Sequence, residues 1–169
     1  RNARLTRVEI RDNDLANARF QSEGILLDAR DGGSLSDAVV TNNTVNGTES
    51  FGAVSVSASG TDSEMFDVEV TRNTLADSAV GVAVTSAQDA GFAGDVRVES
   101  NEISNIDVGV GVSSAQDFRE IDIEGNTITT AEFGIGVETP FDPATDYTVT
   151  AETFENRIEN TSIGLGVGG

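Results

Sequence analysis

The sequence contains no cysteine, no histidine, no lysine and no tryptophan among its 169 residues. Without cysteine and histidine there can be no disulfide framework, no zinc site of thiolates or imidazoles, and no nucleophile activated by histidine. All 10 basic residues are arginine, and 29 acidic residues outweigh them, which gives a formal net charge of −19. This charge excludes ordinary nucleic-acid binding, because that function needs a positive surface to replace the counterions of the phosphates.

Long apolar runs are also missing. No stretch reaches the roughly 18 apolar residues of a membrane span, so we expect none. Residues 1–10 lack the apolar core of a signal peptide. If the protein is exported, its signal was removed or lies outside this sequence. The length favours a single domain over residues 1–169.

The acidic residues are spread between short pairs of valine and isoleucine, and 37% of the residues are hydrophobic. Disordered acidic tails are poor in such residues and carry their charge in blocks, so this composition predicts a folded domain with an acidic surface. Repulsion at this charge density is screened in molar salt, where the Debye length is about 3 Å. The absence of lysine and the many acidic and small residues resemble proteins of extreme halophiles, and of haloarchaea in particular.

An asparagine recurs along the chain with apolar residues at fixed offsets, as in VEVTRNTL (Val68–Leu75) and VRVESNEI (Val96–Ile103). Successive copies are 30, 30, 28, 25 and 30 residues apart, so one supersecondary unit of that length is being stacked. An asparagine at a tight turn can adopt the left-handed conformation and bond to the local backbone and to the asparagine above it. We therefore expect a structural ladder of Asn13, Asn43, Asn73, Asn101, Asn126 and Asn156.

Each repeat ends in a second apolar stretch, which in the last four copies reads VGVAV, VGVGV, FGIGV and IGLGV. Alternation with a period of two marks β-strands. Each coil is therefore predicted to hold three short strands, which in the fourth copy are Val96–Val98, Glu102–Ile103 and Val108–Val112. Such a chain returns one layer higher after each coil and forms three parallel sheets, with layers about 4.8 Å apart.

These repeats resemble the right-handed parallel β-helix of the pectate-lyase-like superfamily, whose coil reads roughly I-x-I-x-x-N-x-I-x-x-N-x-x-x-G-I-x-L. The resemblance covers Val8–Val167 and implies an all-β, right-handed parallel β-helix (solenoid) of about six coils. Solenoids need caps to stay soluble, and neither end of the sequence supplies a capping helix. We therefore expect an uncapped fragment, part of a longer protein. Lyases, hydrolases and non-catalytic surface proteins share this fold, so the resemblance leaves the function open.

The alternation predicts that the glycines of the final strand face outward. Active grooves of the superfamily usually lie on that sheet and present Asp, Arg or Lys, and none is present here. A face almost without side chains favours close approach by a polysaccharide, another protein or another β-helix. The alternative is that glycine suits a crowded strand start, which explains only the first residue of each pair. The predicted interaction face comprises Gly81, Gly109, Gly111, Gly134, Gly136, Gly164 and Gly166.

The first strand of each coil carries a polar outward row in which Arg97 is expected between Glu69 and Asp122, at cross-strand distance. Arginine can bind a carboxylate, and neighbouring acids can act as a pair, so these three residues are candidate catalytic residues for uronic-acid chemistry. The alternative is a surface ion-pair ladder that relieves acidic repulsion.

Longer segments connect the last strand of one coil to the first strand of the next, as in Asp28–Asp37 and Ser57–Asp67, and we expect them to be loops. Stacked carboxylates in these segments could hold Ca²⁺ or Na⁺ through oxygen ligands, although no stretch matches a known calcium-binding loop. The alternative is a solvated acidic rim. The candidate metal ligands are Asp89, Asp95, Asp117, Glu120, Asp142 and Asp146.

Two functions from different classes follow from these observations. The first is a non-catalytic extracellular or cell-surface β-helix of a halophile, a scaffold or interaction module that uses the glycine face. The second is a polysaccharide-active enzyme, a lyase or a glycosidase, in which Glu69, Arg97 and Asp122 or the loop acids carry the chemistry. The lack of lysine and histidine favours the first, because lyases of this superfamily commonly use one of them.

Overall fold

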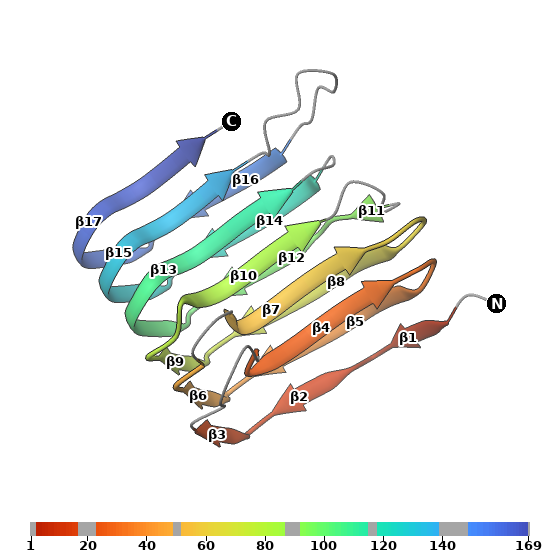
Figure 1. The fold of residues 1–169 in the computed structure, drawn as a ribbon, viewed down its shortest axis with the longest axis horizontal. Coiled ribbons are helices and arrows are strands. Elements are labelled where there is room, and N and C mark those ends of the chain that lie inside the picture. Colours follow the sequence, from red (N-terminus) through yellow and green to blue (C-terminus); the bar gives the residue numbers. More distant parts are fainter. Residues whose placement is uncertain are drawn as a thin grey trace.

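The computed structural model describes residues 3–16, 23–48, 52–86, 92–114, 118–138 and 149–168. Within these ranges every regular element is a β-strand, and the chain winds into a β-solenoid of about five turns (Figure 1). The predicted parallel β-helix architecture is therefore confirmed. About six coils were expected, and the structure has about five turns. The sequence has six copies of the repeat, and the chain makes one turn between each copy and the next. The described residues form no helix long and apolar enough to cross a membrane.

One sheet contains the strand that precedes each ladder asparagine. Its neighbours pair in parallel, one repeat apart, so that Val96 lies between Val68 and Ile121. The eight strands are β1 (Arg4–Thr6), β2 (Glu9–Arg11), β5 (Ser34–Thr41), β8 (Glu64–Thr71), β11 (Phe92–Ala93), β12 (Val96–Glu99), β14 (Phe118–Glu124) and β16 (Val149–Phe154).

The second sheet contains the strands that follow the asparagine. Three sheets were predicted, but the second and third strands of each repeat belong to one sheet. In the later repeats these two strands are one continuous strand with a bend, as in β13, where Asn105 has a positive φ of 55°. The nine strands are β3 (Asp14–Ala16), β4 (Ile25–Arg30), β6 (Thr44–Asn46), β7 (Gly52–Ser59), β9 (Thr74–Ala76), β10 (Val80–Ser86), β13 (Glu102–Ser114), β15 (Thr127–Glu138) and β17 (Arg157–Gly168).

Two of the expected loops, Asp28–Asp37 and Ser57–Asp67, are mostly strand. Strands β4 and β7 run into them and β5 and β8 begin within them, which leaves only short turns around Gly32 and Asp62. The physical reason is that both segments carry an apolar residue that the core can bury. Leu35 is 3% exposed and Met65 is fully buried.

The core consists of like residues stacked on like, one layer per repeat. Val68, Val96 and Ile121 are all 0% exposed, as are Val70 and its neighbours in the same sheet. Each interior layer covers the apolar groups of the layers on both sides, so burial of this kind stabilises the stack as a whole.

The predicted asparagine ladder is confirmed. Asn101 donates from Nδ2 to Oδ1 of Asn126 at 3.0 Å and to the carbonyl oxygen of Val70 at 2.9 Å. Its own Oδ1 accepts hydrogen bonds from the backbone N and the Nδ2 of Asn73, at 2.9 and 3.0 Å. The same side-chain bond links each consecutive pair of Asn13, Asn43, Asn73, Asn101, Asn126 and Asn156.

The left-handed residue of this turn differs from the expected one. It is the residue before the ladder asparagine, with φ of 56° at both Arg72 and Ser100. The backbone thereby reverses one residue early, and the side chain of the asparagine points along the stack. A glycine serves at the same place in one repeat, where Gly125 has a φ of 62°.

Candidate functional site

The glycines of the predicted interaction face fall into two groups. Gly81, Gly109 and Gly134 are buried. A Cβ atom at Gly109 would lie 2.4 Å from the carbonyl oxygen of Gly134 and 2.7 Å from Cγ2 of Ile128, a core residue. These positions therefore face the interior, and Gly164 occupies the same register position in β17. The expectation that they face outward is wrong.

The reason is a bend at the start of each long final strand. Gly109 and Val110 face the interior in succession, so strict alternation fails there. As a consequence Val108 is displaced to the outer face, where it is only half-buried, although the sequence pattern predicts it in the core. Glycine at the same position in four copies was the available signal of a place with no room for a side chain.

Gly111, Gly136 and Gly166 do face outward, as predicted. No atom lies within 4 Å of a Cβ built at Gly136, and one built at Gly111 would meet only Val108 and Val80, at 3.5 and 3.6 Å. The three glycines are register partners on adjacent strands, in one row that continues from Ala83 of β10. They form a flat floor along the outer face of the second sheet.

This floor belongs to a shallow apolar groove of about 260 Å³. One wall is a row of half-buried apolar side chains in register, Val80, Val108 and Phe133. We call the whole feature the apolar groove; it is lined by Val80, Ala83, Thr85, Val108, Gly111, Val112, Ser113, Phe133, Gly136 and Glu138. The alternation that predicts outward-facing glycines predicts that the wall residues beside them face the core, and the wall therefore differs from the expectation.

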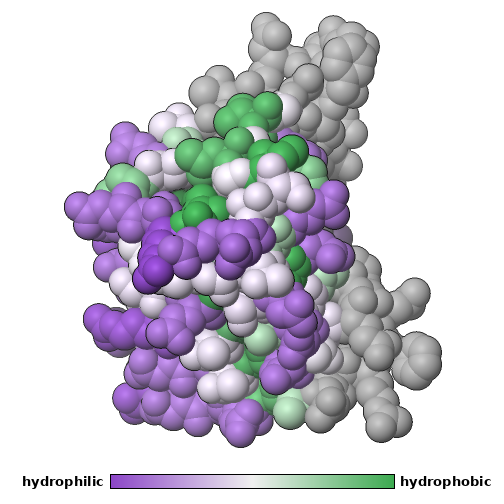
Figure 2. Space-filling view, turned by 90° about the vertical axis from the view of Figure 1, so that its left-hand side faces the viewer, coloured by the Kyte–Doolittle hydropathy of each residue, from purple (hydrophilic) through white to green (hydrophobic). Residues whose placement is uncertain are grey.

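The apolar surface continues onto β17, the outermost strand on the left of Figure 1. Ile163 extends the row of wall residues and is 42% exposed. Leu165 and Val167, at the register of core residues, are 60% and 88% exposed. Figure 2 shows the molecule from this end of the stack, where apolar patches lie among hydrophilic residues.

The borders of the apolar groove are acidic on both sides. Glu138 stands beside the floor, while Asp107 and Glu132 are exposed and immediately precede the wall residues Val108 and Phe133. None of these three carboxylates forms an ion pair with another residue in the part of the chain that the structure describes. β10, β13 and β15 contain no basic residue that could neutralise them.

Asp28 provides the contrast, because it lies on the same sheet and is paired. It accepts a hydrogen bond from Nε of Arg30, and its carboxylate raises the pKa of that guanidinium above its ordinary value. Ser59 also donates to it, with 3.3 Å between Oγ and Oδ1. The carboxylates of the groove have no such partners among the described residues.

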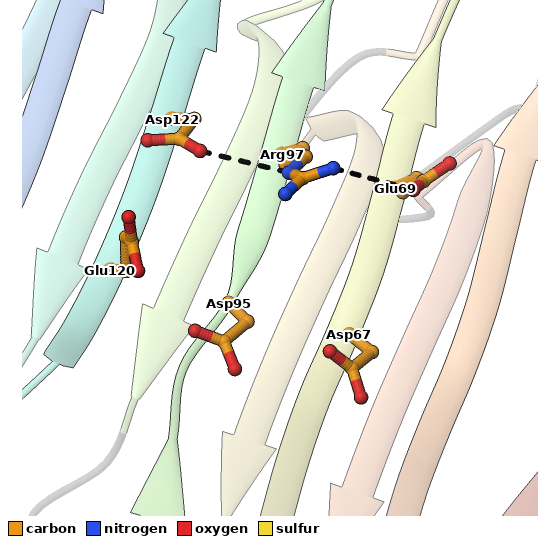
Figure 3. Close-up of a pocket in the computed structure, with 6 residues that line it drawn as sticks. All are labelled: Asp67, Glu69, Asp95, Arg97, Glu120 and Asp122. Atoms are coloured by element: carbon orange, nitrogen blue, oxygen red, sulfur yellow. Dashed lines mark ion pairs between the residues drawn. The ribbon is translucent and has the colours of Figure 1, made fainter.

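On the first sheet, the structure brings together the three catalytic candidates. Arg97 lies between its neighbours, with Nη1 4.0 Å from Oε1 of Glu69 and Nε 3.6 Å from Oδ2 of Asp122 (Figure 3). The register of β8, β12 and β14 fixes this order, so the predicted row is confirmed. All three side chains are partly exposed, and the Arg97 side chain is 61% exposed.

Two candidate metal ligands, Asp95 and Glu120, join this site. Together with Asp67 they form a second row beside the first, and the six residues line a pocket of about 270 Å³ (Figure 3). Within the described ranges, no group of three or more acidic side chains is placed to hold a metal ion. The other candidates, Asp89, Asp117, Asp142 and Asp146, lie outside the described residues.

The charge of this pocket limits what it can bind. Five carboxylates line the pocket with one guanidinium. The distances from Arg97 nitrogens to the oxygens of Glu69 and Asp122 both exceed the usual hydrogen-bond distance. A uronic acid would bring another negative charge into this field and be repelled. The local charge therefore favours a neutral or cationic group over the uronic acid expected for Arg97.

Both surfaces lie on a β-solenoid whose parallel, in-register strands are consistent with a parallel β-helix. No protein-family model, no curated protein and no solved structure matches the chain. Its function must therefore be argued from its own residues.

Proposed function

We propose that this protein is a non-catalytic scaffold of the cell surface or extracellular space that binds its partner through the apolar groove. The observation that carries this proposal is the open floor at Gly111 and Gly136 beside the exposed wall of Val108 and Phe133. Exposed apolar surface that is rimmed by polar residues is a common form of interaction site. The groove also offers no arginine, lysine or histidine, and its only carboxylate is Glu138.

The setting we propose is a high-salt environment, and the ancestry a halophilic branch of the pectate-lyase-like β-helices. The net charge of −19 without any lysine supports the first part. The asparagine ladder and the repeat pattern support the second. In molar salt the repulsion between stacked carboxylates is screened, while apolar contacts such as those of the groove are strengthened by excluded salts.

Substitution of the groove floor tests the proposal. We expect Gly136→Arg to abolish binding without unfolding the protein, because the open space at this position admits the side chain. Binding to a panel of polysaccharides and self-association would be followed by sedimentation in molar KCl, and folding by circular dichroism. The control is Thr74→Arg, which places the same charge on an exposed position of β9. Association that survives Gly136→Arg would contradict the proposal.

A second candidate function is a polysaccharide-active enzyme, and one observation favours it. Arg97 and five carboxylates line one pocket, and acid–base cleavage of a glycosidic bond uses a pair of such carboxylates. Because of the pocket's negative charge, the substrate would be a neutral or amino-sugar polymer. A depolymerisation screen in molar KCl against neutral and amino-sugar polymers, followed by the appearance of new reducing ends, tests this candidate directly.

Arg97→Ala separates a catalytic role from a structural one. Its two ion pairs are long and exposed, and such pairs contribute about 0–1 kcal/mol. We therefore expect the urea midpoint to change little. If the wild-type protein cleaves a polymer, loss of turnover in a variant of unchanged stability would support catalysis. A drop in stability of about 2 kcal/mol would instead mark Arg97 as part of a structural ladder.

A further inference from the structure

The proposed function does not say which class of molecule is the partner. The chemistry and size of the apolar groove restrict that class. We infer that the groove binds a short extended peptide segment of another protein that carries both apolar and basic side chains. This inference rests on the proposed function and names the partner class for the same site. Its three supports are the chemistry of the floor, the charge of the borders and the size of the groove.

The floor and wall are suited to apolar side chains. Val80, Val108 and Phe133 supply the wall, and the polar groups along the opposite side are Thr85, Ser113 and Glu138. A sugar ring presents hydroxyls around its whole edge, and burying them without partners is unfavourable. Valine, leucine or isoleucine side chains can instead occupy the open space above Gly111 and Gly136 at no such penalty.

The borders are suited to a cation. Glu138 on one side and Asp107 and Glu132 on the other are exposed and have no ion-pair partner among the described residues. Lysine or arginine side chains can lay their aliphatic stems on the apolar wall and bring their charge to these carboxylates. At low ionic strength a second copy of this chain would bring a further net charge of −19 to the same place and be repelled, whereas molar salt screens this repulsion.

The groove is the size of a peptide segment. The residues that line the groove lie on three adjacent strands, β10, β13 and β15, so two steps of about 4.8 Å give a length of about 10 Å. An extended chain covers that length in about three residues, at about 3.3 Å per residue. A site of this length is much smaller than a standard interface between folded proteins, which buries about 800 Å² on each side. A linear segment therefore fits better than a folded face.

The test uses three blocked heptapeptides with a fluorescent label, followed by anisotropy. One alternates valine and lysine, one alternates serine and lysine, and one alternates valine and glutamate. We expect the valine–lysine peptide to bind in the lowest KCl concentration at which circular dichroism shows folded protein. The serine–lysine peptide should bind at least about tenfold more weakly, because it loses the apolar contacts. The valine–glutamate peptide should not bind.

Two protein variants locate the binding. Gly136→Val fills the floor without changing charge and should abolish binding of the valine–lysine peptide. Glu138→Gln should weaken it by up to about fivefold and reduce its salt dependence. The matched control is Glu102→Gln, an exposed glutamate of the neighbouring strand β13 that does not line the groove. Equal binding to wild type and Gly136→Val would overturn the inference, since it would show attraction by acidic charge alone.

The outcomes also separate this inference from the proposed function. If the valine–lysine peptide does not bind, but a polysaccharide binds or the protein self-associates in a way that Gly136→Arg abolishes, the scaffold function stands and the peptide inference fails. If no ligand binds and Gly136→Arg changes no association, both fail.

Discussion

Replacing Gly109 with alanine is expected to lower the free energy of unfolding by about 3 kcal/mol. The added Cβ would lie 2.4 Å from the carbonyl oxygen of Gly134 and 2.7 Å from Cγ2 of Ile128. That oxygen belongs to the backbone of the next layer, so it cannot move away without disturbing the parallel pairing of β13 with β15. Urea unfolding followed by circular dichroism at fixed KCl would measure the loss.

The control is Gly136→Ala, on a strand with the same sequence pattern. A Cβ there meets no atom within 4 Å. Because alanine loses less backbone entropy on folding than glycine, we expect no loss and a gain of up to about 0.5 kcal/mol. Equal destabilisation by the two substitutions would show that the bend does not divide the glycines into an inward and an outward group.

Asn101→Ala is expected to destabilise the protein by about 4 kcal/mol. Asn101 is 1% exposed and makes four side-chain hydrogen bonds. When this side chain is removed, the backbone N–H and the side-chain amide of Asn73 each lose an acceptor. The carbonyl oxygen of Val70 and Oδ1 of Asn126 each lose a donor. Water cannot replace it readily in a buried stack, so the desolvation penalty of these groups remains.

Asn13→Ala provides the comparison at an exposed position. Asn13 donates from Nδ2 to Asn43 at 2.9 Å and to the carbonyl of Arg11 at 3.0 Å, and water can reach the groups that its loss exposes. We expect a loss of about 1 kcal/mol. Thermal or urea unfolding of both variants under one condition gives the difference. Similar losses at both positions would mean that burial does not determine the contribution of the ladder.

The features that follow from register could be predicted from the sequence. Once a repeat with a constant offset is recognised, parallel stacking places equivalent residues above one another. The asparagine ladder and the order of Glu69, Arg97 and Asp122 follow from that rule alone. The rule does not depend on side-chain detail, which is why it held across repeats of 25 to 30 residues.

The features that depend on a departure from alternation could not be predicted. Val108 faces outward and Gly109 faces inward, the reverse of the prediction, because the chain bends after the left-handed residue Asn105. Strict alternation of inward and outward residues does not include such a bend. The pocket around Arg97 was only partly foreseen for a related reason. Asp95 and Glu120 were assigned to loops, whereas they lie beside the sheet row and add their charge to it.

Because the ladder repeats in every layer, the length of the molecule is set by the number of layers. Each layer contacts only the layer on either side, and every layer presents the same set of bonding positions. Duplication of one repeat within the gene would therefore add one layer of about 4.8 Å without altering the rest. The same event would lengthen the apolar groove by one row, so that the reach of its binding surface could evolve in fixed increments while its cross-section stays constant.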